Sequence, residues 1–156
     1  MGDGNKDRPN VIAFPPLVFG LGLGIGFLLH WLWPVPIGSP QPPRWIGGAL
    51  AVSSAVLALW GSQTMRRAGT NIKPTEPTTA IVQTGPFRFS RNPLYVSLTI
   101  LYVGVSWMFN ALIPLLLLPP LLIFVHFGIV RREERYLEAK FGSEYTDYCK
   151  RVRRWI

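Results

Sequence analysis

The sequence predicts an all-α integral membrane protein with four transmembrane helices. Of its 156 residues, 49% are hydrophobic and 15% are charged, which is more apolar than an ordinary soluble domain of this size. The apolar residues gather in stretches without charge, over residues 9–43, 45–65 and 92–130. Each stretch is long enough to cross a hydrocarbon core of about 30 Å. We therefore treat residues 1–156 as a single membrane domain.

The first two spans are predicted over residues 11–33 and 45–65, joined by a Pro-rich connection. The first span contains two overlapping pairs of glycines four residues apart, Gly20 with Gly24 and Gly22 with Gly26. Small residues at this spacing allow close helix packing in membranes. The glycines lack the Gly-x-Gly-x-x-Gly spacing of a nucleotide-binding turn.

The third apolar stretch must form a helical hairpin over about 93–130. As one helix its 39 residues would extend about 58 Å, nearly twice the thickness of the hydrocarbon core. Phe109-Asn110-Ala111 is the polar break near its middle. The sequence therefore predicts helices over 93–108 and 112–130, with a bend in the second at Pro119-Pro120.

The charges predict the orientation of the chain in the membrane. Of 16 Lys and Arg, only Arg44 falls on the far side of the four spans; the others, which include Lys6, Arg8 and Lys73, lie in the N-terminal tail, the loop 66–92 and the tail 131–156. The positive-inside rule then places both termini, this loop and the active site in the cytoplasm. Attraction to anionic lipid accounts for the net charge of +8 without nucleic acid.

The tail 131–156 is predicted to form two short amphipathic helices on the cytoplasmic membrane surface, with a break at Gly142. Its Cys149 is the single cysteine of the chain, which excludes an intramolecular disulfide and a Cys-based metal cluster. We expect Cys149 to take no part in the chemistry, and we expect no metal site.

The stretch from Gly85 to Tyr95 is the first candidate for chemistry. Asn92 is suited to the N-cap of a helix and Pro93 to its first position. The unpaired N–H groups of that helix would face Arg88 and Arg91, an arrangement that suits a carboxylate or a phosphate. The same residues also suit a basic anchor beside a transmembrane helix, and the stretch alone leaves both interpretations open.

The second candidate is the acidic pair Glu133-Glu134, just beyond the fourth span. Its basic neighbours Arg131, Arg132 and Arg135 are also compatible with a solvated cluster of ion pairs. His126, seven residues before Glu133, is predicted to lie two helical turns away on a similar face. Ionisable groups in or beside a span are functional candidates.

Together these stretches resemble the isoprenylcysteine carboxyl methyltransferase family and its phospholipid methyltransferase relatives. The resemblance rests on Gly85-Pro-Phe-Arg-x-Ser-Arg-Asn-Pro-x-Tyr95, the uncharged hairpin, and Glu133-Glu134-x-x-Leu137 with Phe-Gly142-x-x-Tyr145-x-x-Tyr148. It implies a membrane methyltransferase that binds S-adenosylmethionine in a cytoplasmic pocket. The methyl acceptor implied is lipophilic, an isoprenylcysteine-like carboxylate or a related small or lipid substrate.

The resemblance also assigns roles to individual residues. Arg91, Pro93 and Tyr95 match the family's Arg-His-Pro-x-Tyr motif, in which Asn92 stands where the best-known members have His. Catalytic roles are implied for Arg91, Asn92 and Glu134. The implied cofactor-binding residues are Arg88, Asn92, Pro93, Tyr95, His126, Glu133, Glu134, Tyr145 and Tyr148. Methyl transfer from a sulfonium needs no protein nucleophile or metal, and positioning supplies most of the rate.

Two other functions compete with this interpretation. Membrane sterol and steroid reductases share a similar hairpin and tail, and the surplus arginines here would then bind the 2′-phosphate of NADPH. A non-catalytic membrane scaffold protein is the other alternative, and Asn92 in place of His is the feature that favours it.

Overall fold

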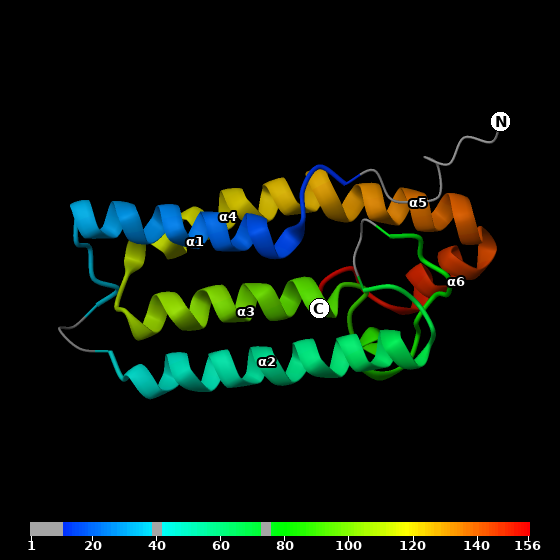
Figure 1. Cartoon of the computed structure of the whole chain (residues 1–156), viewed down its shortest axis with the longest axis horizontal. Helices are drawn as coiled ribbons and strands as arrows, with labels where there is room; N and C mark the ends of the chain where they lie inside the picture. The colour runs from blue at the N-terminus through cyan, green and yellow to red at the C-terminus, as the bar shows by residue number, and fades with distance from the viewer. Residues whose placement is uncertain (1–10, 39–41, 73–75) are drawn as a thin grey trace.

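The computed structural model describes residues 11–38, 42–72 and 76–156, and this part of the chain is helical with connecting loops. Helices α1 (Pro15–Leu32), α2 (Arg44–Arg67), α3 (Pro93–Met108) and α4 (Leu112–Val125) lie side by side along the long axis (Figure 1). The all-α class is thus confirmed. Lys6, Arg8 and Lys73, which were counted for the orientation, lie outside the described residues.

Three of the described helices are long and apolar enough to cross a membrane, namely α1, α2 and the continuous helical segment Leu112–Phe141. Helix α3 is apolar but has only 16 residues. The turn of the hairpin lies where predicted, because α3 ends at Met108 and α4 begins at Leu112, but α4 ends at Val125 and not at residue 130. Between them Asn110 has a φ of 50°, a conformation that Asn adopts more readily than most residues.

The bundle packs as two helix pairs, α1 against α4 and α2 against α3. The pair Gly22 and Gly26 faces α4, and a Cβ on Gly26 would lie 2.7 Å from the Cα of Pro114. A Cβ on Gly20 or Gly24 would meet open space. Close packing is therefore confirmed for one of the two glycine pairs of the first span.

Two neighbouring glycines of α2 allow a direct test of the contact with α3. A Cβ on Gly47 would lie 2.5 Å from the carbonyl oxygen of Gly104 and 2.8 Å from the amide nitrogen of Met108, whereas a Cβ on Gly48 would meet open space. We expect Gly47→Ala to destabilise the protein by about 1–3 kcal/mol through overpacking. Gly48→Ala should be neutral or stabilise it by up to about 1 kcal/mol. Unfolding of both variants in the same detergent measures the difference, and equal stabilities would contradict this packing.

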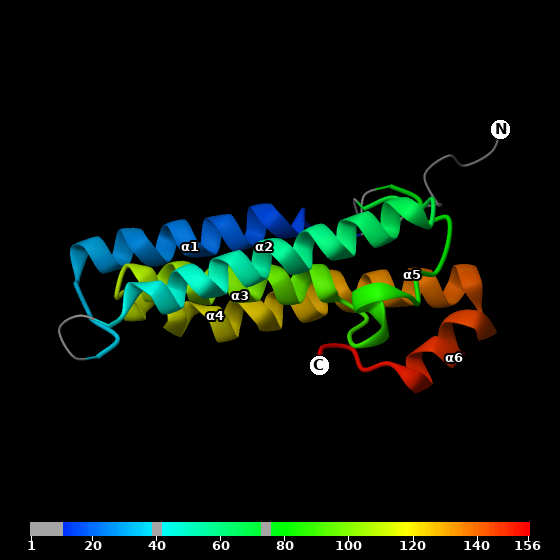
Figure 2. The same ribbon diagram turned by 90° about the horizontal axis from the view of Figure 1, so that it is seen from below.

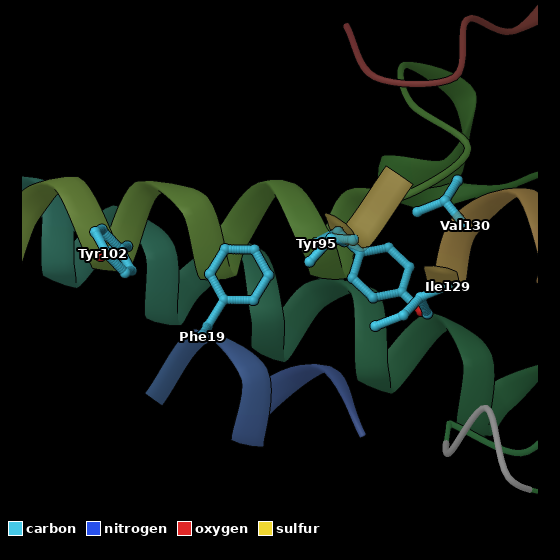
Figure 3. Close-up of a cluster of buried hydrophobic side chains, with 6 residues drawn as sticks. Phe19, Tyr95, Tyr102, Ile129 and Val130 are labelled. Atoms are coloured by element: carbon cyan, nitrogen blue, oxygen red, sulfur yellow. The ribbon is translucent and has the colours of Figure 1, made fainter. Parts of the chain in front are cut away.

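The core lies where α1, α3 and α4 meet, and it leads towards the charged end of the bundle. Phe19, Tyr95, Tyr102, Ile129 and Val130 are buried together (Figure 3). The rings of Phe19 and Tyr102 meet edge to face at 6.4 Å, a favourable aromatic geometry. Tyr95, Ile129 and Val130 lie at one end of this core. The polar residues of α5, which follow Val130 in the chain, are therefore attached to a closely packed part of the structure.

Beyond the apolar run, the chain continues without a break through a π-helical turn, η2 (His126–Val130), into α5 (Arg131–Phe141). Figure 1 shows α5 extending the axis of α4. Gly142 has a φ of 55°, which reverses the chain into α6 (Ser143–Arg151). The break at Gly142 is as predicted, but α5 prolongs the bundle instead of starting as a separate helix after the fourth span.

The last residues, 152–156, return to the start of α3, and Figures 1 and 2 both place the end of the chain beside that helix. We call this segment the C-terminal strap. Its position brings residues distant in sequence to the start of the helical hairpin.

Candidate functional site

The candidate site lies at one end of the bundle, where α3 and α5 meet the loop after α2 and the tail. The 3₁₀ helix η1 (Gly85–Arg88) leads into α3. A cavity of about 80 Å³ opens there, and we call it the polar cavity. Its lining includes Thr70, Asn71, Ile72, Val82, Phe87, Arg91, Asn92, Glu133, Glu134, Leu137, Tyr145 and Tyr148.

Glu134 is the centre of an ion-pair cluster in this cavity. Arg154 donates from Nε to Oε1 at 2.8 Å and from Nη2 to Oε2 at 2.8 Å, while Nη1 of Arg91 lies 3.1 Å from Oε1. The side chains of Arg91 and Glu134 are only 13% and 14% exposed. A carboxylate held by two guanidinium groups at this depth is fixed in place and does not behave as a solvated surface pair.

Glu133, the preceding residue of α5, lines the same cavity but has a different partner. Its Oε2 accepts a hydrogen bond from the Tyr95 hydroxyl at 2.8 Å. No described residue donates a hydrogen bond to its second oxygen. Burial raises the pKa of the Glu133 carboxyl, and the bond from Tyr95 opposes that rise. The second oxygen of Glu133 can therefore still accept a hydrogen bond from a ligand in the cavity.

Arg91 also has capacity for a ligand. Its Nη1 donates to Sγ of Cys149 at 2.6 Å as well as contacting Glu134. Its Nε is buried and has no hydrogen-bond partner among the described residues. A buried guanidinium N–H without a partner is costly, so an acceptor beside Arg91 is expected when the site is in use. Cys149, which we expected to take no part, supports this side chain.

The strap covers the start of α3. The amide of Arg91 donates to the carbonyl of Arg153 at 3.0 Å, and Nδ2 of Asn92 donates to the carbonyl of Arg154 at 2.9 Å. Asn92 is at the N-cap position, but its side chain makes no capping bond. Two carbonyl oxygens of the strap therefore lie beside the helix start at which we predicted an anion, and the anion itself stays a prediction.

Two tyrosines of α6 complete the wall. The hydroxyl of Tyr148 donates to the carbonyl of Phe87 at 2.7 Å and so joins α6 to η1. Burial is the main cause that raises the pKa of both Tyr145 and Tyr148. Both hydroxyls are therefore protonated at neutral pH and act as hydrogen-bond donors.

Two apolar spaces lie near the polar cavity. One, of about 160 Å³, shares part of its lining with the cavity; we call it the apolar chamber. The shared residues are Met65, Ile72, Phe87, Arg91, Asn92 and Glu133. The other, of about 430 Å³, lies between α3 and the α4–η2 segment and shares no lining residue with the cavity; we call it the outer groove.

The sequence profile of phospholipid methyltransferases matches residues 43–144, which is about two thirds of the chain. The chain belongs to the phospholipid methyltransferase family. The match spans α2, the hairpin, α5 and the first residues of α6, and so includes most of the polar cavity. The protein is therefore a membrane methyltransferase by family, and its long apolar helices agree with this.

A shorter relative is also recognisable. A protein from Haemophilus influenzae, described only as an uncharacterized protein, is 44% identical over 64 residues, which are 40% of this chain and the whole of that protein. It adds no function to the family assignment.

The family resemblance nominated ten residues, and the structure brings most of them together. The polar cavity is lined by Arg91, Asn92, Glu133, Glu134, Tyr145 and Tyr148. Pro93 and Tyr95 line the apolar chamber. Arg88 is exposed at the end of η1 and lies outside both linings.

His126 lies apart from the other nominated residues, in the lining of the outer groove. The prediction that it shares a face with Glu133 assumed a regular α-helix. The π-turn His126–Val130 replaces i→i+4 bonds by i→i+5 bonds, which changes the register of the residues after it. His126 instead lies beside Trp155, with ring centroids 6.3 Å apart.

Arg154 is the main site residue that the sequence did not single out. It is one of several basic residues in the tail, and no spacing relates it to Glu134, 20 positions earlier. Among the described residues, no group of three or more His, Cys, Asp or Glu is placed to hold a metal ion.

Proposed function

We propose that this protein is an S-adenosylmethionine-dependent methyltransferase that acts at the membrane on a lipophilic acceptor. One observation carries the proposal: the polar cavity contains both a carboxylate oxygen and a buried guanidinium N–H that the described residues leave unpaired. The amino acid end of S-adenosylmethionine carries an ammonium and a carboxylate, which need one group of each kind. Members of the family generally use this cofactor.

In this proposal each wall of the cavity has a role. Glu133 accepts from the ammonium, and Nε of Arg91 donates to the carboxylate. Glu134 and Arg154 hold Arg91 in position, and Asn92 fixes the strap that carries Arg154. The cofactor supplies the methyl group as an electrophile. The protein contributes placement of the acceptor and exclusion of water.

The apolar chamber is the route that we propose for the acceptor. It is bounded by Phe14 to Pro16 at the start of α1 and by Met65 near the end of α2, and it reaches Tyr95 and Glu133. A lipid that enters here brings its reactive end to the residues shared with the polar cavity. The charges of Arg91, Arg154, Glu133 and Glu134 cancel formally, so the net charge of these side chains does not choose among carboxylate, thiol and amine acceptors.

The distribution of charge supports the proposed orientation, in which α3 crosses the membrane together with α1, α2 and the α4–η2 segment. The loop after α2 and the segment from α5 to the strap lie at the same end of the bundle (Figure 2). That end contains the ion-pair cluster and the basic residues of the tail. We therefore propose that the site faces the cytoplasm.

Binding to the purified, folded protein tests the cofactor assignment. Calorimetry should show binding of S-adenosylmethionine and of its demethylated product S-adenosylhomocysteine, and NADPH should not bind. NADPH binding alone would favour the reductase alternative, although Arg91 and Arg154 are already paired with Glu134. Transfer of labelled methyl groups to a panel of carboxylate, thiol and amine lipids then tests catalysis. Cofactor binding without any labelled lipid would favour the non-catalytic scaffold.

A further inference from the structure

The outer groove is the largest of these three spaces, and the proposed reaction does not use it. Its volume is about 430 Å³, and residues of α3, of the α4–η2 segment and of the strap form its walls. They are Val96, Thr99, Ile100, Leu122, Ile123, His126, Phe127, Trp155 and Ile156. The lining is almost wholly apolar, which suits a hydrocarbon chain.

The groove ends beside an exposed positive charge. The guanidinium of Arg131 lies 5.5 Å from the centre of the Phe127 ring, and Phe127 lines the groove. None of the described carboxylates forms an ion pair with Arg131. An apolar groove next to an unpaired cation has the two features that a lipid with an anionic headgroup needs, one for the chain and one for the phosphate.

The groove is separate from the polar cavity, and the strap lies between them. Asn92 and Glu134, which line the cavity, contact the main chain and the side chain of Arg154. The next residue, Trp155, lines the groove. A lipid in the groove would therefore not reach Glu133 or Arg91, but it would contact the segment that holds Arg154 in place.

We propose that the outer groove binds one acyl chain of an anionic bilayer lipid, with the headgroup at Arg131 and the chain against Trp155. This lipid is distinct from the methyl acceptor. Its binding does not depend on the proposed methyl transfer, because no residue of the polar cavity takes part.

Quenching of Trp155 fluorescence tests the proposal directly. The full chain, with Trp31, Trp33, Trp45, Trp60 and Trp107 replaced by Phe, keeps Trp155 as its one tryptophan. This protein is reconstituted into phosphatidylcholine vesicles that contain phosphatidylglycerol, with bromine on the chains of one lipid or the other. Brominated phosphatidylglycerol should quench Trp155 more strongly than the same fraction of brominated phosphatidylcholine. Equal quenching by the two lipids would overturn the proposal.

Matched variants separate a bound lipid from general contact with the bilayer. Ile100→Phe fills the groove and should reduce the quenching to that of bulk lipid, whereas Leu101→Phe, at the next and exposed position of α3, should not. Arg131→Gln should reduce the preference for phosphatidylglycerol about fivefold, the factor for about 1 kcal/mol per basic residue near the surface, and Arg135→Gln should leave it. If Ile100→Phe leaves the quenching of Trp155 unchanged, Trp155 faces bulk lipid or a second copy of the chain. If the protein failed to bind S-adenosylmethionine, the quenching experiment would still test whether a lipid occupies the outer groove.

Discussion

Replacing Glu134 with Gln should lower the free energy of unfolding by about 3 kcal/mol. The Glu134 carboxylate accepts from Arg154 at 2.8 Å and lies 3.1 Å from Nη1 of Arg91. Gln retains one carbonyl oxygen but loses the negative charge, so two guanidinium groups then face each other at a site where Arg91 is only 13% exposed. Removing one partner of a buried ion pair typically costs about 3–5 kcal/mol, and the exposure of Arg154 places this case at the low end.

Chemical denaturation in detergent measures this loss, and Glu138→Gln is the matched control. Glu138 is exposed on the same helix, α5, so its replacement should change stability by less than about 0.5 kcal/mol. The double variant Glu134→Gln with Arg154→Gln should be more stable than Glu134→Gln alone, because it removes one of the two uncompensated charges. Equal stability of Glu134→Gln and Glu138→Gln would show that the cluster is a solvated surface network.

Features that depend on local sequence were predictable. Residues 92–130 contain no charged side chain, and a single helix of this length would be too long for the membrane. The stretch must therefore form a hairpin, and the polar residue Asn110 marks its turn. The resulting helix bounds, Pro93–Met108 and the start at Leu112, agree with the structure. The change of direction at Gly142 was also predictable, because glycine adopts a positive φ without strain.

Features that depend on contacts between distant segments were not predictable in this way. The π-turn at His126–Val130 has no sequence signal that we recognise, and it moves His126 away from the acidic pair. Arg154 reaches Glu134 only because α6 folds back and the strap crosses the start of α3. The role of the Asn92 side chain depends on the same strap, since its partner is the Arg154 carbonyl and not the first turn of its own helix.

The two adjacent glutamates should differ in what they do, and Glu133→Gln is the variant that shows it. Glu133 has a single described partner, the Tyr95 hydroxyl at 2.8 Å, and Gln can still accept that bond. We therefore expect stability close to that of the wild type, in contrast to Glu134→Gln. Binding of S-adenosylhomocysteine should weaken about 100-fold, because a charge-assisted hydrogen bond to the ligand ammonium contributes up to about 3 kcal/mol.

Calorimetry on wild type, Glu133→Gln and Glu138→Gln, all at a temperature where each is folded, tests this assignment. The exposed Glu138 variant removes the same charge and should bind like the wild type. Tyr95→Phe adds a second readout: it removes the bond that holds Glu133 in place, so affinity should fall by less than in Glu133→Gln while the carboxylate charge is retained. If Glu133→Gln binds S-adenosylhomocysteine as tightly as the wild type does, Glu133 does not hold the ligand ammonium. Glu133 and Arg91 would then not be the recognition site for the amino acid end of the cofactor.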